Sequence, residues 1–257
     1  MKLQDELRSL REPAPLGLLD RVLAEIGLAD QYALRPSPLG DVFVAFNGRG
    51  VTTVDLAVSA AAFEERFTEI HGRRAVRTAE LPARIAAQVD KALATGRPGQ
   101  LALDLTGLSE FHQAVLLTAA TIPRGEVRPY GWIAKEIGKP DAVRAVGTAL
   151  ARNPVPVIIP CHRVVRSDGT LGKYSLGSEE NKRTLLAIEG LNVENLERLA
   201  ARGVRFLGSN TTRVFCHPTC HNARRITDAH RVEFLSEAAA SKAGYRACQV
   251  CRPARAA

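Results

Sequence analysis

The sequence predicts an α/β fold of the mixed, α+β kind, and three observations support this prediction. Strand and helix signals alternate up to about residue 107, helical signals dominate residues 108–190, and four of the five cysteines lie after residue 215. A chain of 257 residues with 46% hydrophobic and 24% charged content has room for two or three modest domains. We therefore expect a small α+β domain, a mainly helical domain and a compact cysteine-rich module.

The first part of the chain alternates between helix and strand signals. Apolar residues recur at helical spacing over 18–26, and residues 41–56 are typical of two strands joined by a turn that contains glycine. Helical spacing returns over 63–70 and 85–93, and a short strand is expected over 101–104. These signals predict a small α+β unit with a β-hairpin.

The second part is predicted to contain a helix-turn-helix. A helix is expected over 130–137, a tight turn follows at 138–140, and Asp141 is a suitable N-cap for a second helix over 142–152. Helical hairpins of this kind also occur in proteins that do not bind DNA, so the pattern alone does not establish DNA binding. Gly147 lies inside the second helix at a cost of about 1 kcal/mol relative to Ala, so we expect another backbone segment to approach it closely.

A proline-rich apolar run, residues 153–160, leads from this helix to Cys161 and His162. Its prolines exclude helix and favour extended geometry, so we expect an extended active-site segment that delivers the cysteine into an apolar pocket. An imidazole beside a thiol can accept its proton, directly or through one water, and so maintain the reactive thiolate. For an isolated pair, a buried structural cysteine beside a surface histidine is the more common interpretation, so the neighbouring motifs decide.

The other four cysteines form a Cys-x3-Cys pair and a Cys-x2-Cys pair: Cys216 with Cys220, and Cys248 with Cys251. In a reducing compartment, this spacing predicts four thiolate ligands for one Zn²⁺ ion, because each short turn can direct two sulfur atoms at a tetrahedral ion. Disulfides are the alternative. No organic cofactor is expected.

Positive charge is concentrated in the second half of the chain. Residues 1–110 hold 13 Lys and Arg against 15 Asp and Glu, whereas residues 111–257 hold 22 against 12. This asymmetry is typical of a protein that binds a polyanion, although a solvated arginine-rich face would give the same counts. The sequence shows neither an N-terminal apolar leader nor a run of about 20 apolar residues, so we expect a cytoplasmic monomer without membrane contact.

Several motifs in one order carry a family resemblance: residues 122–130, 144–147 and 153–164, followed by Tyr174-Ser175 and Glu189-Gly190. Over about residues 38–190 the chain closely resembles the O6-alkylguanine-DNA alkyltransferases. The resemblance implies a ribonuclease-H-like α+β domain followed by a helical domain that binds double-stranded alkylated DNA through its helix-turn-helix. It also implies an irreversible, single-turnover transfer of a methyl or larger alkyl group from a flipped O6-alkylguanine, and from O4-methylthymine, to a cysteine.

The resemblance also assigns catalytic roles. Cys161 is the acceptor, His162 takes its proton through a water molecule, and Glu189 orients the imidazole. Tyr130 protonates or hydrogen-bonds the departing guanine, and Asn153 holds the turn between the recognition helix and the active-site segment.

Five further residues are implied to lie at the DNA. Arg144 would fill the gap left by the extruded base in the minor groove. The others are Gly147, Arg163, Tyr174 and Ser175.

The C-terminal residues 210–224 and 243–253 resemble the zinc module of the Ada adaptive-response regulator. In that family the cysteine that matches Cys216 accepts a methyl group from a methylphosphotriester, which makes Cys216 a candidate second methyl acceptor. Flanking phosphates would be held by arginines: Arg213, Arg224, Arg225 and Arg246. A zinc module that only anchors the chain on DNA is the alternative.

Two other functions remain open. The chain could be a DNA-binding regulator or damage sensor of the Ada type, switched by methylation at Cys216. It could also be a non-catalytic alkyltransferase-like binder, but relatives of that kind lack the acceptor thiol that Cys161 supplies.

Five segments are expected: a helical extension (1–37), the α+β domain (38–107), the alkyltransferase domain with its helix-turn-helix (108–190), a linker helix (191–204) and the zinc module (205–254).

Overall fold

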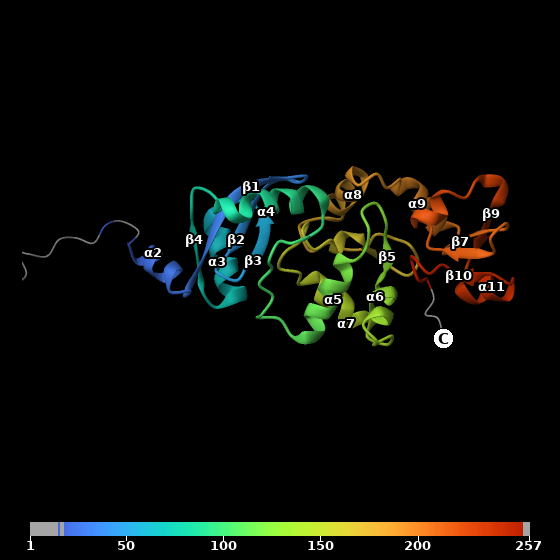
Figure 1. Ribbon diagram of the computed structural model, residues 1–257, viewed down its shortest axis with the longest axis horizontal. Coiled ribbons are helices and arrows are strands. Elements are labelled where there is room, and N and C mark those ends of the chain that lie inside the picture. The colour runs from blue at the N-terminus through green and yellow to red at the C-terminus, as the bar shows by residue number, and fades with distance from the viewer. Residues whose placement is uncertain (1–14, 16–17, 254–257) are drawn as a thin grey trace, which may run out of the picture.

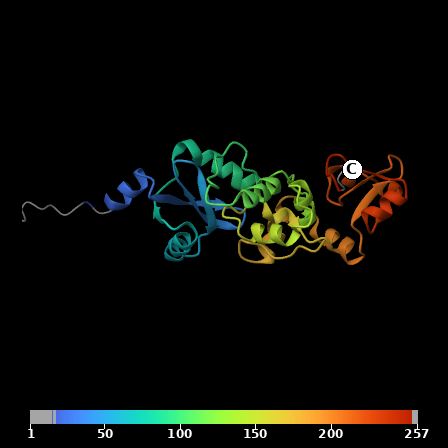
Figure 2. The ribbon, with the colours of Figure 1, turned by 90° about the horizontal axis from the view of Figure 1, so that it is seen from below.

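The computed structural model describes residue 15 and residues 18–253. These residues form an elongated molecule, with one four-stranded sheet at each end and a cluster of helices between them (Figure 1). Figure 2 shows the same order from a perpendicular direction. The expected N-terminal extension lies partly outside the described residues, as does residue 254 at the end of the expected zinc module. The expected helical extension up to residue 37 is wrong, because residues 29–37 form a strand that pairs within the first sheet.

The first sheet has the strand order β3-β2-β1-β4. Its strands are β1 (Ala29–Ser37), β2 (Gly40–Phe46), β3 (Val51–Leu56) and β4 (Arg74–Arg77). The first three run antiparallel, which confirms the predicted hairpin over residues 41–56, and β4 lies parallel to β1. The predicted helices are present as α2 (Leu18–Glu25), α3 (Ala60–His71) and α4 (Ala83–Thr95).

Both faces of this sheet are covered because the side chains of β2 alternate between two cores. Phe43 packs against Phe63 of α3, with 5.2 Å between ring centroids. Val42 and Val44 instead join the large core that contains Val89 of α4. This alternation fixes the sheet against the central helices.

The strand predicted over residues 101–104 is wrong. Only Leu103 pairs, in an isolated bridge with Val51. The chain then turns away, because the carboxylate of Asp104 accepts hydrogen bonds from the backbone N–H and hydroxyl of Thr106.

The central part contains the predicted helix-turn-helix. Its elements are α5 (Glu110–Ala120), β5 (Arg128–Pro129), α6 (Tyr130–Glu136), α7 (Val143–Ala151), the 3-10 turn η1 (Cys161–Arg163), β6 (Val164–Val165) and α8 (Glu179–Ile188). Two details differ from expectation. Ala142 caps α7 without a side-chain bond, because the turn continues through a bond from its N–H to the carbonyl of Lys139, so Asp141 is not the N-cap. Cys161 opens a 3-10 turn and does not extend the preceding segment, because Arg163 N–H bonds the carbonyl of Pro160.

The C-terminal part follows helix α9 (Val193–Ala201) and contains the second sheet, with strand order β10-β8-β7-β9. Its elements are β7 (Phe206–Ser209), β8 (Val214–Cys216), α10 (His221–Arg224), η2 (Asp228–His230), β9 (Arg231–Phe234), α11 (Glu237–Lys242) and β10 (Arg246–Ala247). Gly208 is required in β7, because a Cβ atom there would lie 2.7 Å from the ring of Phe234 and 2.8 Å from that of Tyr245. Among the residues that the structure describes, no helix has both the length and the apolar character needed to cross a membrane.

A buried lysine fastens the turn that carries Cys161. The ammonium group of Lys182, on α8, donates to the carbonyl of Val164 at 2.6 Å and to that of Leu171 at 2.7 Å. Its side chain is fully buried, and this burial lowers the pKa of Lys182 to about 8. Lys182 thereby connects helix α8 to the two segments that contain Val164 and Leu171, both of which follow the cysteine.

Replacing this lysine should destabilise the fold. Lys182→Met leaves two buried carbonyl oxygens without donors, so we expect the free energy of unfolding to fall by about 2–4 kcal/mol in urea denaturation. Lys91→Met, at an exposed position of α4, is the matched control and should change stability by less than about 0.5 kcal/mol. Equal stability of Lys182→Met and the unmodified chain would contradict this role.

Candidate active site and metal centre

Cys161 lies at the base of a cavity of about 360 Å³. The cavity is lined by residues from the helix-turn-helix and from the loop after β6: Tyr130, Gly147, Leu150, Ala151, Lys173, Tyr174 and Ser175. Only 5% of the cysteine is exposed. The volume is in the range of small-molecule pockets, so a reacting group has to enter the cavity to reach the sulfur.

Gly147 keeps this cavity open. A Cβ atom at this position would meet no atom within 4 Å, so the expected close approach of another backbone segment is wrong. Because Gly147 lines the cavity, a side chain there would project into free space. The missing side chain leaves this space open.

The sulfur of Cys161 is held by two polar side chains. Asn153 Nδ2 lies 3.2 Å from it and the hydroxyl of Ser175 lies 3.3 Å from it. Asn153 also donates to the carbonyl of Ile159 and accepts from Val155 N–H, which fixes the turn between α7 and the cysteine. Burial raises the pKa of the Cys161 thiol in spite of these contacts, so ionisation at neutral pH requires a base.

That turn is conformationally strained at Val157. This residue has a φ of 69° although it is β-branched and almost fully buried. A non-glycine residue in this region costs about 1–3 kcal/mol and persists only where the surroundings impose it. The two hydrogen bonds of the Asn153 side chain with backbone groups span this position and impose the conformation.

His162 and Glu189 form a buried pair next to the thiol, with 2.9 Å between Nε2 and Oε1. Burial opposes ionisation of Glu189, but hydrogen bonds from His162 and Arg163 outweigh it and lower the pKa of the carboxyl to about 2. The charged carboxylate therefore holds the proton on Nε2, and burial lowers the pKa of the imidazole, so that it is neutral at pH 7. Nδ1 is then the basic nitrogen, and it has no partner among the described residues.

Arg163 is enclosed and does not face solvent, so the expected DNA contact of this side chain is wrong. Its exposed fraction is 0%, and its guanidinium donates to Glu189 at 2.6 Å and to the carbonyls of Ile122 and Thr95. A guanidinium with these partners has no free face for a phosphate. Arg163 instead fixes the carboxylate that orients His162.

A backbone contact to the same carboxylate had no signal in the sequence. Gly125 N–H donates to Glu189 Oε2 at 3.1 Å. The glycine is required because its φ is 72° and a Cβ atom would lie 2.9 Å from the carbonyl oxygen of Glu189. Lys182 is a second contributor that sequence reasoning missed, since a lysine in a helix is normally exposed.

The remaining candidates surround the cavity. Tyr130 is half-buried, and burial together with the charge of Cys161 raises the pKa of its phenol, so the hydroxyl keeps its proton at neutral pH. The ring of Tyr174 lies edge-on to His162, with centroids 6.2 Å apart. Arg144 is exposed on α7, the helix that also carries Gly147. Ser175 is half-buried and reaches the sulfur, as described above.

The four C-terminal cysteines form a compact buried cluster. The sulfur atoms of Cys216, Cys220, Cys248 and Cys251 all lie within 4.8 Å of one another, and none is in a disulfide. A tetrahedral zinc with bonds of about 2.3 Å requires sulfur atoms at this separation, so the donor set fits one Zn²⁺ and the disulfide alternative is not realised. Asn222 Nδ2 lies 3.5 Å from Cys248 Sγ, which is the kind of second contact that orients thiolate ligands.

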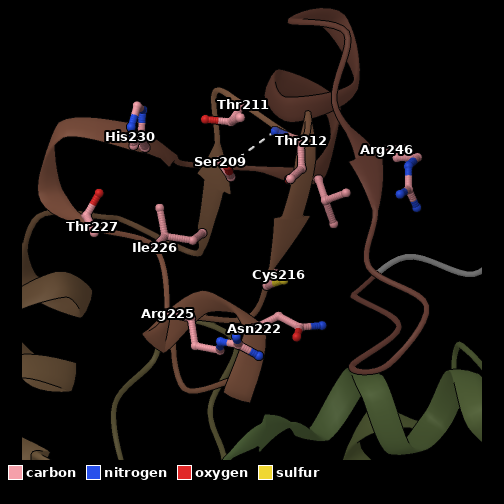
Figure 3. Close-up of a pocket in the computed structure, with 11 residues that line it drawn as sticks. Ser209, Thr211, Thr212, Cys216, Asn222, Arg225, Ile226, Thr227, His230 and Arg246 are labelled. Atoms are coloured by element: carbon pink, nitrogen blue, oxygen red, sulfur yellow. Dashed lines mark hydrogen bonds between the residues drawn. The ribbon is translucent and has the colours of Figure 1, made fainter.

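One zinc cysteine, Cys216, also lines a surface pocket of about 440 Å³ (Figure 3). Arg225 and Arg246 line the same pocket. The other two arginines expected there lie elsewhere. The guanidinium of Arg213 lies over the ring of Tyr245 at 5.2 Å, and that of Arg224 lies near Gly125.

Two family models match the chain. The model described as the DNA-binding domain of 6-O-methylguanine DNA methyltransferase matches residues 110–191, and the model described as the metal-binding domain of Ada matches residues 197–254. The second match agrees with the cysteine cluster, which is a site for one Zn²⁺ with four cysteine ligands.

Individual relatives agree with these matches. A methylated-DNA–protein-cysteine methyltransferase of Methanosarcina barkeri is 36% identical over 163 residues, which are 63% of this chain and 98% of the relative. The enzyme of the same name from Mycolicibacterium paratuberculosis is 51% identical over 34% of this chain and 52% of the relative. The bifunctional transcriptional activator/DNA repair enzyme Ada of Escherichia coli is 38% identical over 65% of this chain and 47% of the relative.

The structural comparison gives the same family. A structure of Mycobacterium tuberculosis OGT matches with a TM-score of 0.51 and 31% identity over 65% of this chain and 99% of that chain. The present chain spans about half the length of the mycobacterial and E. coli relatives above, but nearly all of the Methanosarcina one. On this basis the chain belongs to the methylated-DNA–protein-cysteine methyltransferase family.

Proposed function

We propose that this protein repairs DNA by transferring a methyl or larger alkyl group irreversibly from O6-alkylguanine, and from O4-methylthymine, to Cys161. The observation that carries this proposal is a buried thiol that lines a cavity and is followed in the chain by His162, which is paired with the buried Glu189. The M. tuberculosis OGT structure is of a complex with DNA, which supports double-stranded alkylated DNA as the partner.

The geometry supports a direct displacement at the alkyl carbon. The thiol proton passes through a water to Nδ1 of His162, and Glu189 stabilises the imidazolium that forms. The sulfur–carbon bond forms as the carbon–oxygen bond breaks, and the guanine recovers a proton with Tyr130 as the donor at the cavity wall. The imidazolium then releases its proton to water and the Tyr130 phenolate takes one up from water, so the proton lost by the thiol is balanced by the proton gained by guanine. The thioether product has no S–H group from which a thiolate could form, so each protein molecule reacts once.

The DNA has to present an extruded nucleobase, because a nucleobase stacked in the duplex does not reach a buried sulfur in this cavity. We assign the exposed Arg144 to the gap left in the duplex, and Gly147 to the open entrance beside it. Tyr174 and Ser175 also line the cavity, and we assign them to contacts with the extruded base. The positive charge of the chain after residue 110 favours association with phosphates.

A second candidate function is methyl transfer from a methylphosphotriester to Cys216. This cysteine lines a pocket together with two arginines, Arg225 and Arg246. The bound zinc ion would keep the four sulfurs deprotonated, and four thiolates on one Zn²⁺ leave a net charge of −2 that favours a neutral phosphotriester over an ordinary phosphate. Because the chain is similar to E. coli Ada, a DNA-binding regulator switched by methylation is the alternative function. A footprint of the protein on DNA that becomes stronger after methylation would support this alternative.

We also propose the expected division of the chain, with the α+β domain extended to include β1 (Ala29–Ser37), together with a monomer and a cytoplasmic location. One chain supplies both the acceptor and the cavity, so the transfer requires no second copy. None of the five cysteines, all of which the structure describes, is in a disulfide, which is typical of a reducing compartment.

Transfer to Cys161 is tested by peptide-resolved mass spectrometry after incubation with a duplex that contains O6-methylguanine. We expect one methyl group per chain, on the peptide of Cys161. Cys161→Ala should abolish this product while the dissociation constant for the damaged duplex stays within about threefold, because the side chain contributes little to the DNA-facing surface. An unmodified Cys161 that is shown to be reduced would refute the proposal.

The transfer rate should depend on pH through His162. Burial lowers the pKa of this imidazole below its ordinary value of about 6.5, so the basic form persists down to about that pH. We expect the single-turnover rate constant to be nearly constant from pH 8 to about 6.5 and to fall in more acidic buffer. Glu189→Gln should lower the rate constant at pH 7.5 by about 10²–10⁴-fold. A midpoint above pH 7 in the unmodified chain would contradict this assignment.

Exposure to methylphosphotriester DNA tests the second acceptor. The methyl group should map to Cys216 and to none of the other zinc cysteines, because only Cys216 lines the pocket. Arg246→Gln should slow this reaction about tenfold without loss of zinc, since it removes a phosphate contact. Arg202→Gln is the control, because that arginine pairs with Glu233 and does not line the pocket. Methylation at another cysteine, or equal rates in the two variants, would exclude this site.

A further inference from the structure

One short segment, residues 124–130, lies between the active site and the zinc cluster. On the active-site side, Gly125 N–H donates to Glu189 Oε2, and the Arg124 guanidinium donates to the carbonyl of Ile188 at 3.0 Å. The last residue of the segment, Tyr130, lines the Cys161 cavity. We call residues 124–130 the bridging segment.

The other side of the bridging segment contacts the first zinc knuckle, the loop from Cys216 to Cys220. The hydroxyl of Thr219 accepts from Val127 N–H at 2.9 Å and lies 3.3 Å from the Val127 carbonyl. Just after the knuckle, His221 N–H donates to Glu126 Oε1 at 2.9 Å. Thr219 and Glu126 are almost fully buried, so water does not replace these bonds when they are lost.

The second zinc knuckle, from Cys248 to Cys251, contacts the helix that follows. The indole N–H of Trp132 donates to the carbonyl of Cys251 at 3.0 Å. Arg252 lies over the same ring at 5.7 Å and forms an ion pair with Glu136 at 2.8 Å. Both knuckles therefore hold the chain that begins at the bridging segment and continues through α6.

The two knuckles share one set of metal ligands. A single ion bound by four cysteines fixes the position of Thr219 relative to the carbonyl of Cys251. Thr219 bonds Val127 and the Cys251 carbonyl bonds Trp132, so the ion fixes both points at which the zinc module contacts the bridging segment and α6. A displacement of about 1 Å at a catalytic group can reduce a rate about 10²-fold. The bridging segment contacts one such group, Glu189, and contains another, Tyr130.

We infer that the zinc module is a positioning part of the Cys161 site, in which Thr219 holds the bridging segment and thereby aligns Glu189 and Tyr130. This role goes beyond phosphotriester repair or DNA anchoring by the module. The kinetic consequence rests on the proposed alkyl transfer to Cys161, whereas the structural consequence is independent of it.

The test compares Thr219→Val with Thr219→Ser in the full zinc-loaded chain. Valine has the size of threonine but no hydroxyl, so Val127 loses its partner, whereas serine keeps the hydroxyl. Three quantities are measured: hydrogen exchange of the backbone amides over residues 125–130, the zinc content, and the single-turnover rate constant of methyl transfer as a function of DNA concentration.

For Thr219→Val we expect exchange at Val127 to be at least about tenfold faster, and the maximal rate constant to fall about 3–30-fold. The dissociation constant for DNA should stay within about twofold, because the contact lies away from the DNA-facing cavity. Zinc should remain at one ion per chain. Thr219→Ser should restore exchange and rate to within about twofold of the unmodified chain.

Trp132→Phe tests the second knuckle independently, because it removes only the donor to Cys251 and keeps an aromatic ring. It should change exchange and rate in the same direction. Ser241→Ala, at an exposed position of α11, is the matched control and should change neither.

Unchanged exchange and rate in both Thr219→Val and Trp132→Phe would overturn the inference. A Thr219→Ser variant as slow as Thr219→Val would also overturn it, because the hydroxyl would then not be the group that matters. If the unmodified chain transferred no methyl group to Cys161, the proposed function would fail, while the exchange measurements would still decide whether the zinc module holds the bridging segment.

Discussion

The site depends on one buried carboxylate that has to remain charged. Glu189 receives hydrogen bonds from the His162 imidazole, the Arg163 guanidinium and the Gly125 backbone. These donors come from two separate stretches of chain, the cysteine turn and the segment before α6. Without them burial would raise the pKa of the Glu189 carboxyl, and a protonated carboxyl would no longer keep the imidazole proton on Nε2. The charge on Glu189 thus links the cysteine turn, α8 and the segment before α6 into one electrostatic unit.

The thiol side of the site is organised by shape more than by charge. Asn153 holds both ends of a turn in which Val157 adopts a φ of 69°, and Lys182 fastens the carbonyl of Val164 just beyond the cysteine. These hydrogen bonds hold the strained turn on both sides of the cysteine, so the sulfur has little freedom to move. The Cys161 thiol is therefore held at a fixed depth, and reactivity depends on what enters the cavity.

Local patterns predicted most elements and the residue types of both centres. Periodicity predicted the hairpin and the paired helices, cysteine spacing predicted the metal ligands, and His162 was found beside Cys161 in the sequence. Glu189 was identified through the family resemblance. The failures share a physical cause. The side-chain environments of Arg163 and Lys182 depend on carbonyls and carboxylates contributed by other segments, and the bond between Val127 and Thr219 joins residues 92 positions apart. No periodicity or spacing encodes such contacts.

The junction between the zinc knuckles and α6 also has an optical consequence. Trp132 is the only tryptophan in the chain, it is 5% exposed, and the guanidinium groups of Arg128 and Arg252 lie 5.8 Å and 5.7 Å from its ring centroid. Indole emission is sensitive to nearby charge and to water, so the intrinsic fluorescence of the unlabelled protein comes from a single reporter placed where the second knuckle meets the helix-turn-helix. Separation of the two parts would be visible in the spectrum of the native chain without any engineered probe.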